Sequence, residues 1–339
     1  MASNDFLPFA AGSGANVLSQ AAYAALAALG PGFASGVAQS AACNKAWRQG
    51  SIMAAVVAQL IVDSTGQNAT DDGTTTTLLT NLKAAIHAQS IAVIGQARNL
   101  AVNQTAASSS LTMTADQIVV GTGLTGLTYV LPSFNKTVNL ATTGAGGMDT
   151  GSAPVSGFVA LYAIYNPTTG TSALLAVNAT SAAAPAVYGG ANMPSGYTAS
   201  GLVSVWPTNG SGQFVIGAQI DRDFFTAGTN AVTTTTAIPQ GTFAAVNIAT
   251  IVPKNARKIN TAMQCQGGAS AQNTLVNLYI TSTGSILGAQ AAGNSGSIGQ
   301  LNVQVNGIAL LTPQTFWWNC NVSSGTFTSA GIIINGYSI

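Results

Sequence analysis

Two aspartates in the β-rich part of the chain have the type and spacing that carboxylate chemistry needs. Hydrolysis of a glycosidic bond normally takes two placed carboxyl groups, and Asp221 and Asp223 form the only close pair in that part. Side chains two positions apart share one face of a strand, so these two carboxylates can lie together. The simpler interpretation, which we favour, is a capped strand end with Arg222 as counter-charge, or a contact between domains.

The other polar motifs provide no second catalytic set. His87 is the sole histidine, so one chain holds neither a Ser-His-Asp triad nor a multi-histidine metal site. Only three copies of His87 around a threefold axis would offer a metal several imidazoles. Gly121 to Gly126 fit the GxGxxG pattern, but a strand follows instead of a helix, so no phosphate site is expected. We predict no catalytic residue, no metal and no cofactor.

The last third of the chain lacks the residues of acid–base chemistry but holds a distinctive aromatic string. Residues 226–339 contain no Asp, Glu or His, which excludes carboxylate or general acid–base catalysis within that segment. In Phe316-Trp317-Trp318-Asn319, adjacent strand residues point to opposite faces, so one tryptophan can pack inside while the other faces outward. An outward tryptophan beside amides suits sugar stacking or protein contact. Trp317, Trp318 and Asn319 are therefore candidate receptor contacts, with a core or intersubunit role as the favoured alternative.

The cysteines do not form a disulfide framework. There are three, Cys43, Cys265 and Cys320, and an odd, sparse set is typical of proteins folded in a reducing compartment. Cys265 and Cys320 can meet across a sheet, and their pairing stays open, although free buried thiols are the favoured interpretation.

The composition indicates a neutral, self-associating protein. Only 5% of the residues are charged and the net charge is +1, whereas about 25% are charged in a typical soluble domain. This balance excludes nucleic-acid binding through clustered basic residues, and the one basic cluster, Lys254, Arg257 and Lys258, is interpreted as a solvated loop. A neutral surface of hydroxyls and amides risks association, which an obligate oligomer tolerates best.

The chain also lacks targeting signals of the usual kinds. The N-terminus has neither the basic start nor the long apolar core of a secretion signal. The strongest apolar run, Ile52 to Val62, is shorter than the roughly 20 residues that a bilayer needs. We therefore expect synthesis in a cytoplasm and no membrane insertion.

Residues 1 to 105 are predicted to be helical. A first helix runs from Ala15 to Leu29, and a second carries an apolar face at spacings of three and four. That face consists of Met53, Val56, Val57, Leu60 and Ile61. Asp71 and Asp72 read as the start of a third helix, where a carboxylate caps free backbone amides.

The third helix has an incomplete apolar stripe. From Leu78 onward the stripe consists of Leu82, Ile86, Val93, Ala97 and Leu100. Two interpretations stay open, a helix packed on its neighbours and a short parallel bundle between identical chains.

Two β regions follow. Residues 106–225 are predicted to form a central antiparallel β-domain, because strand-like runs recur at turn-length intervals. Residues 226–339 are predicted to form a β-sandwich or jelly-roll with six evenly spaced strands. The run Thr233 to Thr236 is interpreted as a connector. The fold class is thus mainly β, with an α-helical N-terminal region.

Several short strings in the first 225 residues are distinctive in their exact sequence. They are Asn4-Asp5-Phe6-Leu7-Pro8-Phe9-Ala10, Gly36-Val37-Ala38-Gln39-Ser40, Asn44-Lys45-Ala46-Trp47-Arg48-Gln49, Asp71-Asp72-Gly73, residues 157–178, Tyr188-Gly189-Gly190-Ala191-Asn192-Met193-Pro194 and Trp206-Pro207-Thr208-Asn209-Gly210. Together they resemble the N-terminal region and a β-domain of tail fibre proteins from bacteriophages and prophages. Residues 226–339 carry no such likeness.

The resemblance implies an architecture and partners. It implies a homotrimer whose N-terminal region attaches to phage tail or adaptor proteins and whose distal end contacts a bacterial surface glycan or protein. The residues implied in virion attachment are Phe6, Leu7, Phe9, Trp47 and Arg48. The expected location is the virion tail, after synthesis in the bacterial host cytoplasm.

The expected function is therefore host recognition without bond breaking, with avidity from three tips. Two alternatives stay open. A glycan-degrading tailspike requires Asp221, Asp223 or Asp149 to act across a subunit interface. A structural connector would hold another fibre protein with its C-terminus.

Overall fold

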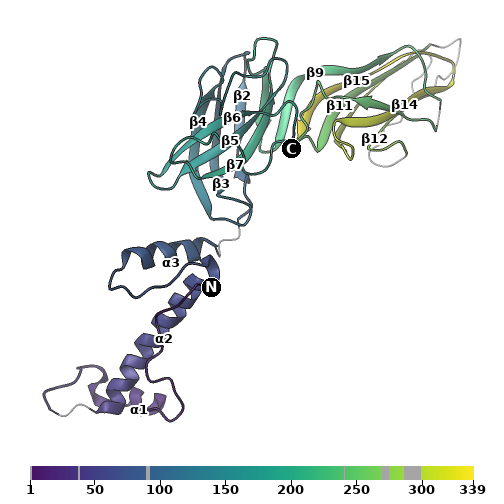
Figure 1. The fold of residues 1–339 in the computed structure, drawn as a ribbon. Coiled ribbons are helices and arrows are strands. Elements are labelled where there is room, and N and C mark those ends of the chain that lie inside the picture. The colour runs from purple at the N-terminus through teal and green to yellow at the C-terminus, as the bar shows by residue number, and fades with distance from the viewer. Residues whose placement is uncertain (1, 37–38, 89–91, 240, 269–274, 286–298) are drawn as a thin grey trace. The chain divides into compact units, whose positions relative to one another are not determined.

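The computed structural model describes residues 2–36, 39–88, 92–239, 241–268, 275–285 and 299–339 (Figure 1). The chain divides into two compact units, one made mainly of residues 1–92 and the other mainly of residues 93–339. The described strands of both sheets pair antiparallel, and strands outnumber helices. The prediction of a mainly β chain with antiparallel sheets is confirmed.

The described helices lie in the first unit. They are α1 (Gln20–Ala24), the 3-10 helix η1 (Ala27–Leu29), α2 (Ser40–Thr65) and α3 (Thr76–Ala88). Ser19 begins α1 by accepting a hydrogen bond from the Ala22 amide at 3.1 Å. Gly66 ends α2 in the left-handed conformation that helix C-termini favour. The first helix is shorter than the predicted range, because the chain turns after Ala24 and continues as η1.

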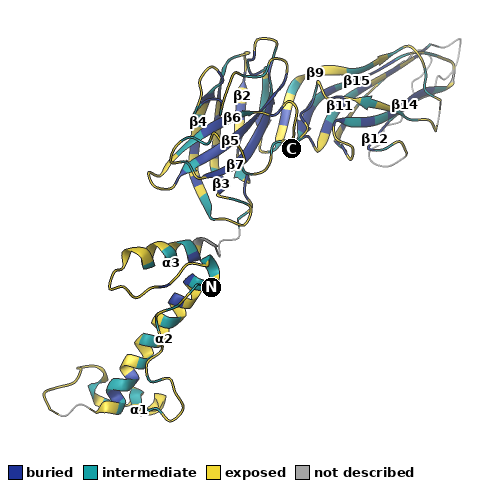
Figure 2. Ribbon diagram, in the orientation of Figure 1, coloured by how far each residue is buried: buried dark blue, intermediate teal, exposed yellow. Residues whose placement is uncertain are grey.

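The core of the first unit is small. Its buried members are Ala58, Ile61, Ala69 and Ala85. Of the apolar face predicted to pack, Ile61 is buried, but Met53 is 62% exposed and Val56 is 57% exposed. The reason is geometric, since α3 has 13 residues and contacts only one side of the 26-residue α2. Figure 2 shows exposed positions along the length of α2.

The later part of the stripe predicted for the third helix, from Val93 onward, is not helical. Gly95 adopts φ +82°, outside the helical range, and its amide donates to the Val119 carbonyl at 2.8 Å. Ala97 begins a short strand, and Leu100 is 1% exposed in the core of the second unit. The prediction of helix to residue 105 is wrong over this stretch, and residues 89–91 lie outside the described part.

The second unit is built from two sheets. Its strands are β1 (Ala97–Arg98), β2 (Ala101–Gln104), β3 (Ser110–Gly121), β4 (Thr128–Asn139), β5 (Phe158–Asn166), β6 (Thr171–Asn178), β7 (Ala199–Pro207), β8 (Gly217–Ile220), β9 (Asp223–Thr234), β10 (Ala244–Asn247), β11 (Lys258–Gly268), β12 (Leu275–Thr281), β13 (Gly299–Ala309), β14 (Thr315–Ser324) and β15 (Thr326–Ser338). The large sheet has the order β13-β11-β15-β9-β8-β2-β3-β7-β5-β6, with β1 and β4 also paired to β3. The small sheet has the order β10-β14-β12.

Strand β5 is buried on both faces, as the dark blue ribbon of Figure 2 shows. Because side chains alternate across a strand, Leu161 enters one apolar core and Tyr162 enters another. The Tyr162 hydroxyl donates to the Pro185 carbonyl at 2.8 Å, which satisfies the one polar atom of that side chain. The run at residues 157–165 therefore forms a central strand, as its aromatic and β-branched residues predict.

Strand β9 was not anticipated by the sequence pattern. The Thr233 connector belongs to this strand, and the predicted domain boundary between residues 225 and 226 falls inside it. At its start β9 pairs with β8, and along its length it pairs with β15. The Phe224 ring lies 4.6 Å from Trp206 and 4.7 Å from Tyr337 between ring centroids. One strand with its aromatic neighbours thus joins the sheet across this boundary.

The small sheet shares a core with the C-terminal strands of the large one. Each of the six strands predicted after residue 226 has a counterpart, from β10 to β15. Leu278 and Cys320 of the small sheet and Cys265 of β11 are fully buried in one cluster. All three cysteines are free thiols, with Cys43 half-buried in the first unit.

Thiol labelling tests this burial. Burial raises the pKa of the Cys265 thiol to about 12 and that of Cys320 to about 11, so little reactive thiolate forms at neutral pH. We expect an alkylating reagent to modify Cys43 at least about tenfold faster than the other two in the native protein. Timed alkylation followed by peptide mapping measures the rates, with the denatured chain as control. Rapid native labelling of Cys265 would contradict the described core.

Candidate functional site

The N-terminal segment lies along α2 and is held there by hydrogen bonds. The Asn4 side-chain amide donates to the Ala55 carbonyl at 3.1 Å. The Phe9 backbone amide donates to the Ser51 hydroxyl at 2.8 Å. The Asp5 amide donates to the Ala69 carbonyl at 3.0 Å. The first two bonds hold the strip on the helix, and the third ties it to the segment that follows α2.

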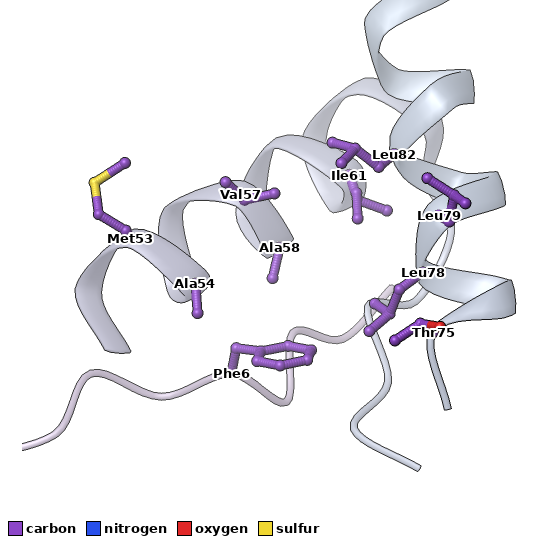
Figure 3. A pocket seen from close by; sticks show the side chains of 10 residues that line it. All are labelled: Phe6, Met53, Ala54, Val57, Ala58, Ile61, Thr75, Leu78, Leu79 and Leu82. Carbon is purple, nitrogen blue, oxygen red and sulfur yellow. The ribbon is translucent and has the colours of Figure 1, made fainter. Parts of the chain in front are cut away.

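Phe6 divides the exposed surface beside this strip into two apolar grooves. The first, of about 460 Å³, runs between α2 and α3 (Figure 3). Phe6 and Ala58 border it in the picture, with Leu78 opposite on α3. The second groove, of about 470 Å³, lies on the other side of the strip and includes Leu7 and Val56. Both grooves are shallow surfaces of aliphatic and aromatic carbon, suited to adhesion and not to chemistry.

Of the residues implied in virion attachment, Phe6 and Leu7 line these grooves, and Phe9 follows them on the same strip of chain. Leu7 is 78% exposed, Phe9 47% and Trp47 62%. The Phe9 and Trp47 rings meet edge to face at 5.8 Å, a geometry that aromatic pairs prefer. Arg48 is half-buried on the same helix. Four of the five side chains thus contribute to one apolar surface, and their role in attachment stays a prediction.

An exposed heptad pattern on α2 is a feature that the sequence interpretation missed. Its positions alternate by four and three, which is the spacing of a coiled-coil seam. This α2 seam consists of Ala46, Gly50, Met53, Val57 and Leu60, all exposed. The apolar spacing was visible in the sequence, but periodicity alone cannot tell whether a neighbour in the same chain covers the face. None of the described helices is both long and apolar enough to cross a membrane.

The aspartates considered for carboxylate chemistry make structural hydrogen bonds. Asp221 lies in the turn between β8 and β9 with φ +51°, and its carboxylate accepts from the Leu100 amide at 3.1 Å. The Asp223 carboxylate, on β9, accepts from the Ser338 hydroxyl. Arg222 donates to the Gly95 carbonyl at 2.8 Å. The two carboxylates do not share a strand face, because Asp221 belongs to a turn, and Arg222 donates to a backbone carbonyl.

The remaining acidic candidates are engaged locally. Asp149 accepts from the Tyr188 hydroxyl at 2.9 Å and so ties two loops together. Asp72 accepts from the amide and hydroxyl of Thr74, and these bonds lower its pKa. His87 lies in α3, but its side chain is outside the described part. The described residues bring together no group of three His, Cys, Asp or Glu that would hold a metal.

The candidate receptor contacts lie on β14 in different surroundings. Trp318 is 4% exposed and Asn319 is fully buried, whereas Trp317 is half-buried on the outer side of the small sheet. The predicted alternation of the two tryptophans matches these positions. Solvent therefore reaches Trp317 and not its two neighbours.

Asn319 is buried because a preceding segment covers it. Its side-chain amide nitrogen lies 2.5 Å from the carbonyl oxygens of Pro239 and Thr242 and 3.1 Å from that of Ile238. Its oxygen accepts from the Asn321 amide at 2.8 Å. The side chain thus holds Ile238, Pro239 and Thr242 against the small sheet.

Replacing this amide tests its structural role. We expect Asn319→Ala to lower the free energy of unfolding by about 1–3 kcal/mol, because three carbonyls lose a buried donor. Urea unfolding followed by tryptophan fluorescence measures the change. Asn302→Ala, at an exposed position of β13, is the matched control and should remain within about 0.5 kcal/mol of the parent. Equal stability of the two variants would contradict the role.

No protein-family model and no curated protein matches this chain. Two solved structures of infectious bursal disease virus show a distant likeness. One is a chain of the T13 IBDV viral particle, with a TM-score of 0.21 and 10% identity over 74% of this chain and 67% of that chain. The other is from the Gx strain, with a TM-score of 0.16 and 8% identity over 73% and 68% of the two chains. This likeness assigns neither family nor function.

Proposed function

We propose that this chain is a homotrimeric phage tail fibre that attaches to the virion by its N-terminal region and recognises the host with its C-terminal β-sandwich. The observation that carries the proposal is the uncovered apolar surface of the first unit. Its core has four buried residues, while five large side chains of α2 stay at least 38% exposed besides Trp47. Monomeric proteins rarely expose such a continuous patch, which typically marks an interaction site.

The α2 seam is the surface assigned to the trimer. A 26-residue helix is about 39 Å long, enough for several layers of a parallel coiled coil. The charged residues of α2, which are Lys45, Arg48 and Asp63, are all off the seam. Self-association therefore buries carbon without burying charge, and it removes the apolar face from water.

The surface formed by Leu7, Phe9 and Trp47 is assigned to the virion. It lies on the strip of chain bound to α2 and offers an aromatic pair with an exposed leucine. Aromatic side chains are typical anchors of protein interfaces. The fibre would thus use two surfaces of one small unit, the seam for its own copies and the strip for the particle.

Recognition by the distal part requires no bond breaking. The carboxylates that a tailspike would use are bound to the backbone or to neighbouring side chains. Residues 226–339 supply no acid, base or imidazole. Binding with avidity from three copies is the mechanism that fits these residues.

A charged residue placed in the α2 seam tests the proposed trimer. We expect the full-length chain to have three times the mass of its 33.8 kDa monomer by light scattering, and Val57→Asp to reduce that mass to one chain, because an aspartate in the seam would be buried without a partner. Thr77→Asp, exposed in the first turn of α3, is the control and should remain trimeric. A monomeric parent, or a trimeric Val57→Asp variant, would contradict the proposal.

Incorporation into particles tests the attachment. We expect the chain to sediment with particles produced from the phage genome that encodes it, and Leu7→Ala with Trp47→Ala to reduce the bound amount by about tenfold or more, because both are exposed anchors. Leu124→Ala, at an equally exposed leucine of the second unit, is the matched control. Quantitative immunoblotting of purified particles measures incorporation. Unchanged incorporation of the double variant would contradict the assigned surface.

A further inference from the structure

The outer face of the small sheet combines aromatic rings with amides. Side chains on its inner face, such as Leu278 and Phe316, are fully buried in the core. By alternation, the neighbouring positions face outward. Two outward residues are aromatic, Tyr279 on β12 and Trp317 on β14, and both are half-buried. The other outward positions within residues 244–247, 277–281 and 315–323 hold Asn, Thr, Ser or Ala.

The strand register places the two rings close together. Thr281 pairs with Trp317, and Tyr279 pairs with Asn319, two residues further along β14. Tyr279 and Trp317 are therefore diagonal neighbours, and such positions have Cα atoms about 7–8 Å apart. The turn after β12 borders the indole, since a Cβ at Gly284 would lie 3.5 Å from Trp317 Nε1. Two aromatic residues thus occupy neighbouring positions on the outer face of the small sheet.

A chain of amides fixes the hydrogen-bonding groups beside the rings. The Asn277 side-chain nitrogen donates to Asn321 Oδ1 at 3.0 Å and to the Ser323 hydroxyl at 2.6 Å. Asn321 in turn donates to the buried Asn319. These bonds orient the Asn277 side chain. Its Oδ1 accepts no hydrogen bond from the described residues, so it is available to a ligand. An oriented acceptor binds with less loss of entropy than a free side chain.

Charge decides which ligand suits this face. Residues 259–339 contain no Asp, Glu, Lys, Arg or His. A charged ligand group would lose water here without gaining a counter-charge, which is costly. Protein interfaces centre on an apolar core, yet the outward positions within residues 244–247, 277–281 and 315–323 hold no Val, Leu, Ile or Met. An uncharged molecule with C–H faces and many hydroxyls fits both facts.

We infer that this face binds an uncharged saccharide, with Trp317 and Tyr279 stacking on the sugar and Asn277 and Ser323 hydrogen bonding to its hydroxyls. The inference rests on the proposed function, because it names the ligand class and the residues of host recognition. Of the candidate contacts on β14, it keeps Trp317 and gives Asn319 the role of holding the amide chain in place. Tyr279, Asn277 and Ser323 are new members.

Saccharide binding by the full-length chain tests the inference. The probe is an immobilised panel of uncharged oligosaccharides of hexoses and N-acetylhexosamines, with sialylated and phosphorylated glycans alongside. We expect binding to uncharged members, reduced at least about tenfold by Trp317→Ala and by Tyr279→Ala. Phe225→Ala, at a 42% exposed aromatic of β9, should bind like the parent. Unfolding midpoints verify folding, and Tyr279→Ala decides if Trp317→Ala does not fold.

The other outcomes overturn the inference in distinct ways. Binding restricted to charged glycans, or equal binding by the folded variants, rules out this face as an uncharged-saccharide site. A monomeric mass for Trp317→Ala would make the face a contact between copies. Cell binding that survives periodate but not protease treatment of the bacteria would indicate a protein receptor, so the ligand class fails while the proposed function stands. Absence of binding to a broad panel of bacterial strains would count against the proposed function itself.

Discussion

The near absence of charge is the constraint on which the rest of this structure depends. With 5% charged residues, the chain uses neutral amides and hydroxyls for many of its buried hydrogen bonds. Gln219 is an example at 2% exposure, since its nitrogen donates to the Val203 carbonyl and its oxygen accepts from the Ser204 hydroxyl. A side-chain amide supplies donor and acceptor together, without the desolvation cost of an ion. Asn319 does the same in the small sheet.

The same constraint acts on the surface of the first unit. In most soluble proteins, charged side chains around an apolar helix face oppose association. Here the exposed seam of α2 lacks them, so nothing electrostatic resists contact between copies. A composition that would threaten the solubility of a monomer therefore favours a defined assembly. In the proposed trimer, contact between copies would bury the apolar face that the small internal core leaves exposed.

The sequence predicted strands well where alternation and turns are local, and less well where a partner is remote. The run containing Tyr162 was identified because aromatic and β-branched residues mark a central strand by themselves. Strand β9 was not predicted, because its residues are only weakly apolar. It is stabilised by pairing with β15, which lies far along the chain. The helical periodicity predicted which positions of α2 are apolar, but it could not predict that most of them are exposed. Likewise Trp317 was noticed alone, since only the strand register joins it to Tyr279.

Edge strands of a sheet expose unpaired backbone groups that can pair with another chain. Proteins usually protect edge strands with charged residues, which are scarce here, and β6 lies at the end of the large sheet. A glycine-rich loop covers it, because the Gly146 amide donates to the Leu174 carbonyl and the Ala176 amide donates to the Gly147 carbonyl, both at 2.8 Å. A Cβ at Gly147 would lie 2.4 Å from the Thr142 carbonyl oxygen, so the loop requires glycine there. At this edge, backbone pairing thus replaces charge as the protection against edge-to-edge association.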